Sequence, residues 1–368
     1  MRTHKAAFWG ICGVLGSALF ASGVALGQYE TDFEGIVATP DGTLLTGQDG
    51  YYLPSGVDFF AYTYAGNVLG VPNNPEGSAQ FVAGVGPGDG TNYARAQRDM
   101  TWGTGIWEVT YDTCGMYLGS GTTNNNVGSF SVQPYPGSQS YIHLLSWVDI
   151  NNPVNWNAFY LAYNADGSAH TQPGKSPGTE WEGLETFHWY RFGTVLDFDT
   201  NKIAYVWVTD LNTGVSGGYA PLDWYLEGGE VGGTPTPTGF RFFGGGGTNS
   251  NNGTAWDNYG AVSADFLCTL EGDCPGPATL HVYGATPGGR VAIVAGTKPG
   301  PFTNPSSPCA GITIDISPSF LPNFPMIVNA DATGHVILNG KLTSKLCGKL
   351  LVQAVDLTTC QTSSLVKK

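Results

Sequence analysis

Carboxylates are the first residues to consider for chemistry, because hydrolysis of a glycosidic bond usually needs two of them. In retaining enzymes the two carboxyl groups stand about 5 Å apart, one as acid and one as nucleophile. Glu182 and Glu185 come closest to such a pair, but on a strand a spacing of three puts them on opposite faces. Asp197 and Asp199 share a face, yet the turn FDTNK follows. We therefore expect no hydrolysis from paired carboxylates.

Aromatic side chains are a second source of binding chemistry, since flat exposed rings stack on the apolar faces of sugars. Trp189 and Trp207 lie in regularly patterned strands, so we expect both to be buried. Trp156 in NNPVNWNAF and Trp181 in PGTEWEG are flanked by turn residues. These two are the candidate ligand-binding residues, with burial in the core as the alternative.

The N-terminal residues decide the compartment. Three basic side chains occur in the first five positions, and the run Ala6 to Phe20 is apolar and uncharged. Ala25 and Gly27 then fit the small residues before a cleavage site at Gln28, so residues 1–27 are predicted to be a signal peptide. No later run approaches the ~18 apolar residues of a membrane span. We expect a secreted or cell-envelope protein without membrane insertion after cleavage; an uncleaved leader acting as an anchor is the alternative.

Cysteine spacing suggests disulfides in that oxidising compartment. Six cysteines follow the leader: Cys114, Cys268, Cys274, Cys309, Cys347 and Cys360. We predict a local bridge between Cys268 and Cys274, one bridge among Cys309, Cys347 and Cys360, and a free, buried Cys114. A zinc site is disfavoured, because no CxxC pair and no nearby His have the required spacing.

Charge divides the chain into two parts. From Gln28 to Cys268 there are 24 acidic and 6 basic residues, whereas Thr269 to Lys368 carries 5 acidic and 7 basic residues. The acidic part would repel nucleic acid and anionic membranes, so neither is expected as a partner. Neutral sugar or calcium is compatible with this charge.

Short apolar runs broken by Gly, Pro, Asn and Asp predict strands and turns throughout, with no long helix after the leader. The expected strands are 80–83, 105–112, 128–133, 141–149, 158–163, 188–197, 202–210 and 239–243. We predict a sandwich over residues 28–267, a cysteine and proline linker over 268–277, and a small immunoglobulin-like sandwich over 278–368.

The large module resembles the concanavalin A-like, or laminin G-like, jelly-roll domains of secreted bacterial proteins. The resemblance rests on TDFEG and TGQDGYY at its start, FHWYRFGTVLDFDTNKIAYVWV in the middle, and FRFFGGGGTNSNNGTAWDNYGAV at its end. It implies an all-β jelly roll whose first and last strands are neighbours and whose middle phrase is a hairpin. It also implies a sugar-directed or extracellular binding role, but no particular reaction. The tail looks like a C-terminal module of secreted bacterial proteins whose function is unknown.

Alginate lyases of the same fold suggest one catalytic comparison. They combine an Arg-bearing strand, a Gln-x-His strand and a late Tyr-bearing strand around one groove. Arg95, Arg98 and His143 are the weak candidates here, because the cations would neutralise a uronate and the His would move a proton. Tyr141 replaces the Gln, however, and the late YKAG-type strand is missing. A structural His143 is therefore the preferred interpretation.

The two ends of the jelly roll could share a structural calcium ion. Asp32 and Glu34 lie at its start, and Asp257 and Asn258 lie at its end. Carboxylate and amide oxygens are ligands that calcium accepts. The alternative is that Asp257 and Asn258 only cap the last strand through local hydrogen bonds.

Three functions remain open from the sequence. The first is a non-catalytic module that binds carbohydrate or another extracellular surface partner. The second is a polysaccharide lyase or glycoside hydrolase with a degenerate motif. The third is a purely structural or adhesive secreted protein.

Overall fold

The computed structural model describes most of the chain from Tyr29 to the C-terminus. Outside the described residues lie 1–28, 77, 90–91, 119–124, 134–142, 150–154, 169–180, 220, 222, 233–236, 246–251, 264, 273, 333 and 364. For residues 125–126, 143–149, 161, 231–232 and 271–272 only the backbone is described. The predicted signal peptide therefore lies outside the description. Among the described residues no helix is long and apolar enough to cross a membrane.

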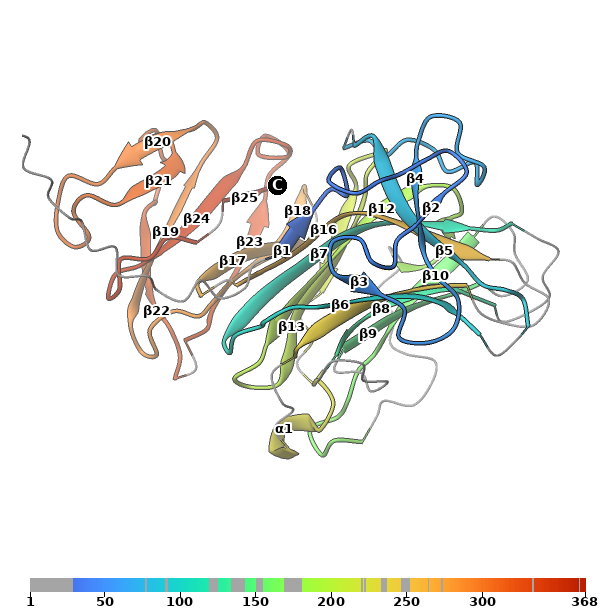
Figure 1. Ribbon diagram of the computed structural model, residues 1–368. Coiled ribbons are helices and arrows are strands. Elements are labelled where there is room, and N and C mark those ends of the chain that lie inside the picture. The colour runs from blue at the N-terminus through green and yellow to red at the C-terminus, as the bar shows by residue number, and fades with distance from the viewer. Residues whose placement is uncertain are drawn as a thin grey trace, which may run out of the picture.

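The first module is a sandwich of two antiparallel sheets that lie face to face (Figure 1). One sheet has nine strands, in the order β14 (Ser216–Tyr219), β13 (Lys202–Asp210), β12 (Trp189–Asp197), β7 (Ile106–Met116), β16 (Gly253–Ser263), β5 (Gln80–Val85), β4 (Phe60–Thr63) and β2 (Thr43–Leu44), with β1 (Tyr29–Thr31) also paired to β16.

The facing sheet has seven strands, in the order β11 (Leu184–Glu185), β10 (Asn155–Leu161), β9 (His143–Asp149), β8 (Asn125–Gln133), β15 (Gly239–Gly244), β6 (Ala94–Asp99) and β3 (Tyr51–Tyr52). A four-residue helix, α1 (Gly229–Gly232), is the only helix among the described residues. The all-β jelly-roll sandwich predicted from the sequence is confirmed.

Two topological expectations are also met. The first strand, β1, pairs with the last strand of the module, β16, so that Thr31 lies opposite Tyr259. The middle phrase forms the β12–β13 hairpin, with Tyr190 opposite Asp210 and a bulge after Val195. The two ends of the module are thus held side by side in the nine-stranded sheet.

The core between the sheets is built from large aromatic rings. Phe242 stacks on Trp256 at 4.6 Å between ring centroids, and Phe240 stacks on Tyr259 at 4.1 Å. Strand alternation sends Trp107, Val109 and Tyr111 of β7 into this core and leaves the intervening residues on the outer face. Burial of such large rings is the main stabilising contribution to this module.

The second module, coloured orange to red in Figure 1, is a small sandwich with its own apolar core. Its sheets are β17 (Leu267–Gly272), β18 (Gly276–Tyr283) and β23 (Val336–Leu342); β22 (Met326–Asn329), β19 (Arg290–Gly296), β24 (Leu351–Asp356) and β25 (Val366–Lys367); and the hairpin of β20 (Pro299–Thr303) and β21 (Thr313–Ile316).

The predicted linker, residues 268–277, was wrong. Residues 268–272 belong to β17, and Gly276 and Pro277 begin β18; Cys268 lies opposite Val282 and contributes to the core of the second module. The Gly and Pro residues that suggested a linker mark the hairpin turn and the first residues of β18 instead.

The predicted bridge between Cys268 and Cys274 was also wrong. Cys274 bonds Cys347, and Cys309 bonds Cys360, as the prediction of one bridge among the last three allowed. Cys268 is buried as a free thiol, and so is Cys114, as predicted. Because Cys268 points into the core, it does not reach Cys274, which is only partly buried and lies beside the turn of the hairpin.

The two modules meet through an apolar contact. Val195 and Tyr205 of the nine-stranded sheet pack against Leu267 and Tyr283 of the second module. The Tyr283 hydroxyl also donates a hydrogen bond to the Ala204 carbonyl oxygen at 3.2 Å. This contact lies on the outer face of β12 and β13.

Candidate functional site

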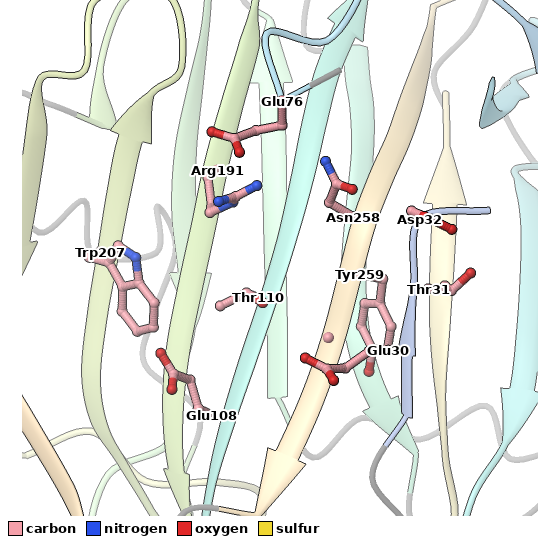
Figure 2. A pocket seen from close by; sticks show the side chains of 11 residues that line it. Glu30, Thr31, Asp32, Glu76, Glu108, Thr110, Arg191, Trp207, Asn258 and Tyr259 are labelled. Carbon is pink, nitrogen blue, oxygen red and sulfur yellow. The ribbon is translucent and has the colours of Figure 1, made fainter. Parts of the chain in front are cut away.

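A groove of about 690 Å³ crosses the outer face of the nine-stranded sheet. Strands β1, β7, β12, β13 and β16 form its floor, as Figure 2 shows. The residues that line it are Glu30, Thr31, Asp32, Glu76, Glu108, Thr110, Arg191, Trp207, Asn258, Tyr259 and Gly260. Its volume is in the range typical of ligand sites.

Strand alternation explains why these side chains meet. On β7 the inward Trp107 and Val109 leave Glu108 and Thr110 on the outer face. On β12 the same period turns Arg191 outward, because Tyr190 and Phe192 face the core. The outward side chains of β7 and β12 therefore form part of the groove.

Trp207 of β13 forms an aromatic wall. Its ring lies against Gly193 of the neighbouring strand, where any Cβ would overlap the indole. Tyr205 stacks beside it, with 5.8 Å between ring centroids and 25° between planes. The expectation that Trp207 is buried was wrong, because its ring is only partly buried and faces the groove. Figure 2 shows it on the side of the groove opposite Glu30.

A β-bulge shapes the other wall. The register of β16 shifts between Asp257 and Gly260, and Asn258 adopts a φ of 45°. The bulge keeps Trp256 and Tyr259 in the core although they are three residues apart, and it leaves Asp257 and Asn258 on the outer side.

Two buried carboxylates lie beneath this wall. Asp112 accepts a bidentate pair of hydrogen bonds from Arg191, at 2.7 Å from Nε and 2.9 Å from Nη2, and a further bond from Asn258 at 2.8 Å. Asp257 accepts hydrogen bonds from Tyr64 at 2.8 Å and from Ser78. The guanidinium charge of Arg191 is thus largely balanced by Asp112 before any ligand binds.

Burial controls the ionisation of the second carboxylate. Desolvation raises the pKa of Asp257 to about 7, although the hydrogen bonds from Ser78 and Tyr64 act in the opposite direction. The nearby charge of Asp112 adds to the rise. Asp257 is fully buried, so it stiffens the wall of the groove rather than contacting a ligand.

The open part of the groove is acidic. Its described lining residues include four acidic side chains and one basic side chain, Arg191. Within the described part of the chain, no hydrogen bond or ion pair within 4 Å engages the carboxylates of Glu30, Glu76 and Glu108. Burial raises the pKa of Glu108. These carboxylates can accept hydrogen bonds from ligand hydroxyl or ammonium groups.

The residues predicted to bind calcium have other roles. Asp257 and Asn258 belong to the hydrogen-bonded group around the buried carboxylates. Asp32 accepts a hydrogen bond from the Glu34 amide at 3.0 Å. The Glu34 carboxylate accepts hydrogen bonds from the Ala79 and Gln80 amides. Among the described residues no group of three or more His, Cys, Asp or Glu side chains is arranged to hold a metal. The calcium site gains no support from these contacts and stays a prediction.

The two predicted ligand-binding tryptophans are in the core. Trp156 and Trp181 are each 1 % exposed. Strand β10 begins at Asn155, so alternation directs Trp156, Ala158 and Tyr160 inward together. Trp181 packs against Phe192 at 5.2 Å between ring centroids.

The lyase candidates do not form one cluster. Arg95 and Arg98 are three residues apart on β6 and therefore lie on opposite faces of the sheet. Arg95 donates to Ser55, whereas Arg98 lies 3.7 Å above the Tyr29 ring. The His143 backbone pairs with Val132, and its side chain lies outside the described residues.

Sequence reasoning did not select Glu108, Arg191 or Trp207 as site residues. A signal was present in GIWEVTYD, where polar residues alternate with large apolar ones. That pattern predicts an outward polar face but not which neighbouring strands complete it.

No protein-family model matches the chain, and no curated protein matches it. Similar solved structures include "Cellulose induced protein, Cip1", at 15 % identity over 64 % of this chain and 97 % of that chain, with a TM-score of 0.31. A carbohydrate esterase from the Shiga toxin-encoding bacteriophage phi24B is 11 % identical over 62 % of this chain and 100 % of that chain, with a TM-score of 0.35. Lectin II from Ulex europaeus is 9 % identical over 50 % of this chain and 86 % of that chain, with a TM-score of 0.31. Likenesses this distant assign neither a family nor an activity.

Proposed function

We propose that this is a secreted protein that binds neutral carbohydrate, without cleaving it, in the groove on the outer face of the nine-stranded sheet. The observation that carries the proposal is the position of Trp207. Its flat ring is partly exposed and lines the same groove as the carboxylates of Glu30 and Glu108.

The chemistry of the groove suits a sugar. A pyranose presents an apolar C–H face, which an indole ring covers at little entropic cost because the ring is already held against Gly193. The hydroxyl groups at the edge of that sugar would donate to Glu108 and Glu30. Asn258 and Thr110 add uncharged polar groups to the lining.

The negative charges in the groove disfavour the binding of acidic sugars. Arg191 is already paired with buried Asp112, so a uronate would meet three or four carboxylates without a free cation. Like charges in one groove are strongly unfavourable. A neutral or amino sugar is therefore favoured over alginate.

A second candidate function is glycoside hydrolysis with Glu108 as the acid. The raised pKa of its carboxyl group favours this role, since a general acid must hold its proton near neutral pH. Release of reducing ends from the bound glycan, lost in Glu108→Gln, would support hydrolysis over binding alone.

The test is a glycan array with the mature protein, followed by calorimetric titration of the best ligand. Trp207→Ala should weaken binding at least about tenfold, and Trp207→Phe should retain most of it, because stacking needs only a flat ring. Phe60→Ala is the matched control, since Phe60 is 38 % exposed on the same sheet and does not line the groove. Equal affinity for wild type and Trp207→Ala would contradict the proposal.

A further inference from the structure

A second hollow of about 520 Å³ lies between the two modules. Glu108, Val262, Ser263 and Asp265 line it from the first module, and Gln361 and Thr362 line it from the second. Glu108 lines both this hollow and the groove. The two spaces therefore share a wall residue and meet at one side chain.

We infer that the groove and this hollow form one continuous track that binds an extended polysaccharide chain, gripped by both modules. The inference rests on the proposed function and adds that the ligand is a polymer rather than a single sugar. It also assigns the second module a part in binding.

The direction of the strands supports a linear track. Glu108 lies opposite Val262 in the β7–β16 pairing, so the end of β16 carries the groove floor toward the second module. The chain then continues through Phe266 and Leu267 into β17, which begins the second module. The β7–β16 pair thus contributes residues to both spaces.

The segment of the second module that lines the hollow, residues 360–362, is held by a disulfide and by backbone hydrogen bonds. Cys360 is bonded to Cys309, and Thr362 bridges to Val355 of β24. The Asp356 amide donates to the Gln361 carbonyl oxygen at 3.0 Å. The exposed side chains of Gln361 and Thr362 are consequently presented from a fixed backbone, which lowers the entropic cost of binding.

Size favours a polymer as well. Each hollow alone has the volume of a small-molecule site, so the two together offer more space than one sugar ring needs. The lining of the second hollow includes carboxylate, hydroxyl and amide groups, which suit the hydroxyl edges of a glycan.

The experiment titrates the mature protein, calorimetrically, with oligosaccharides of increasing length prepared from the best ligand of the array. Affinity should rise with length until both hollows are filled. The double variant Gln361→Ala/Thr362→Ala should lower the affinity for the longest oligosaccharides about fivefold or more and leave the shortest unchanged. Asp265→Ala, on the opposite wall, should have the same length-dependent effect. Lys341→Ala is the control, since Lys341 is exposed on the second module and outside both hollows.

Affinity that does not depend on length, or long-chain affinity that neither variant lowers, would overturn the track and leave the proposed function intact. Failure of every saccharide to bind, or full binding by Trp207→Ala, would overturn the proposed function and the track with it.

Discussion

A pair of histidines beside the module contact should make the second module less stable in acid. His281 of β18 and His335 stack with 5.4 Å between ring centroids, and His281 Nδ1 lies 3.2 Å from His335 Nε2. Tyr283, which bonds the first module, stacks on His335 at 4.5 Å. One nitrogen of the pair must donate and the other accept, so at least one ring must remain neutral for this hydrogen bond.

The size of the effect follows from the surroundings of His335. Desolvation lowers its pKa from 6.5 to about 4, and the electrostatic interaction with His281 adds to the shift. Asp331 opposes this shift, whereas Lys202 of the first module adds to it. At about 1.4 kcal/mol per pKa unit the stability difference would be at most about 3.5 kcal/mol. The ring is partly exposed, so solvent screening reduces this to about 1–2 kcal/mol.

The sign is determined by which state binds more protons. Because the pKa is lowered in the folded protein, the unfolded chain binds more protons between about pH 4 and pH 6.5. The stabilising contribution of neutral His335 is therefore fully present above pH 6.5 and is lost as the pH falls toward 4. His335→Gln, which cannot titrate, should lack this loss.

The assay is urea unfolding of wild type and His335→Gln from pH 4 to pH 7.5, followed by far-ultraviolet circular dichroism. Tryptophan emission separates the modules, since every Trp precedes residue 257. The stability advantage of wild type over the variant should shrink by about 1–2 kcal/mol toward pH 4. A constant difference across this range would refute the reasoning.

Three further predictions concern the first module and the free thiols. Gly193→Ala should displace the Trp207 ring from the sheet and lower glycan affinity about tenfold, while the groove carboxylates stay intact. Unchanged affinity, measured by calorimetry, would show that the ring does not contribute to binding. Burial raises the pKa of Asp257 to about 7, so the folded state binds more protons than the unfolded state between about pH 4 and pH 7. The melting temperature of wild type should therefore fall relative to that of Asp257→Asn as the pH rises over this range. A constant difference between the two melting temperatures would contradict this. Without reductant, mass spectrometry should find Cys114 and Cys268 alkylated only after denaturation, and labelling of either in the native protein would disprove its burial.

Local sequence patterns were enough to predict many of the strands of this protein. Turn residues at regular intervals and β-branched or aromatic runs predicted short strands, because both are local properties of the backbone. The resemblance that rests on the phrases at the two ends of the first module also implied the correct neighbours, β1 and β16, and the central phrase implied the β12–β13 hairpin. The isolated position of Cys114 in the sequence was enough to predict that it is free.

Which faces are covered and which cysteines pair depends on contacts between segments far apart in the sequence. Alternation places Trp156 and Glu108 on definite faces of their strands, but the exposure of a face depends on the sheet or module that packs against it. Trp156 is buried because the nine-stranded sheet covers it, and Trp207 stays partly open because the second module covers only part of the outer face. Cys274 forms a disulfide with Cys347, 73 residues away in the sequence, because disulfide pairing depends on Cα separations in the folded chain. The groove likewise combines strands β1, β7, β12, β13 and β16, and their order in the sheet is a non-local property that no single segment of the sequence contains.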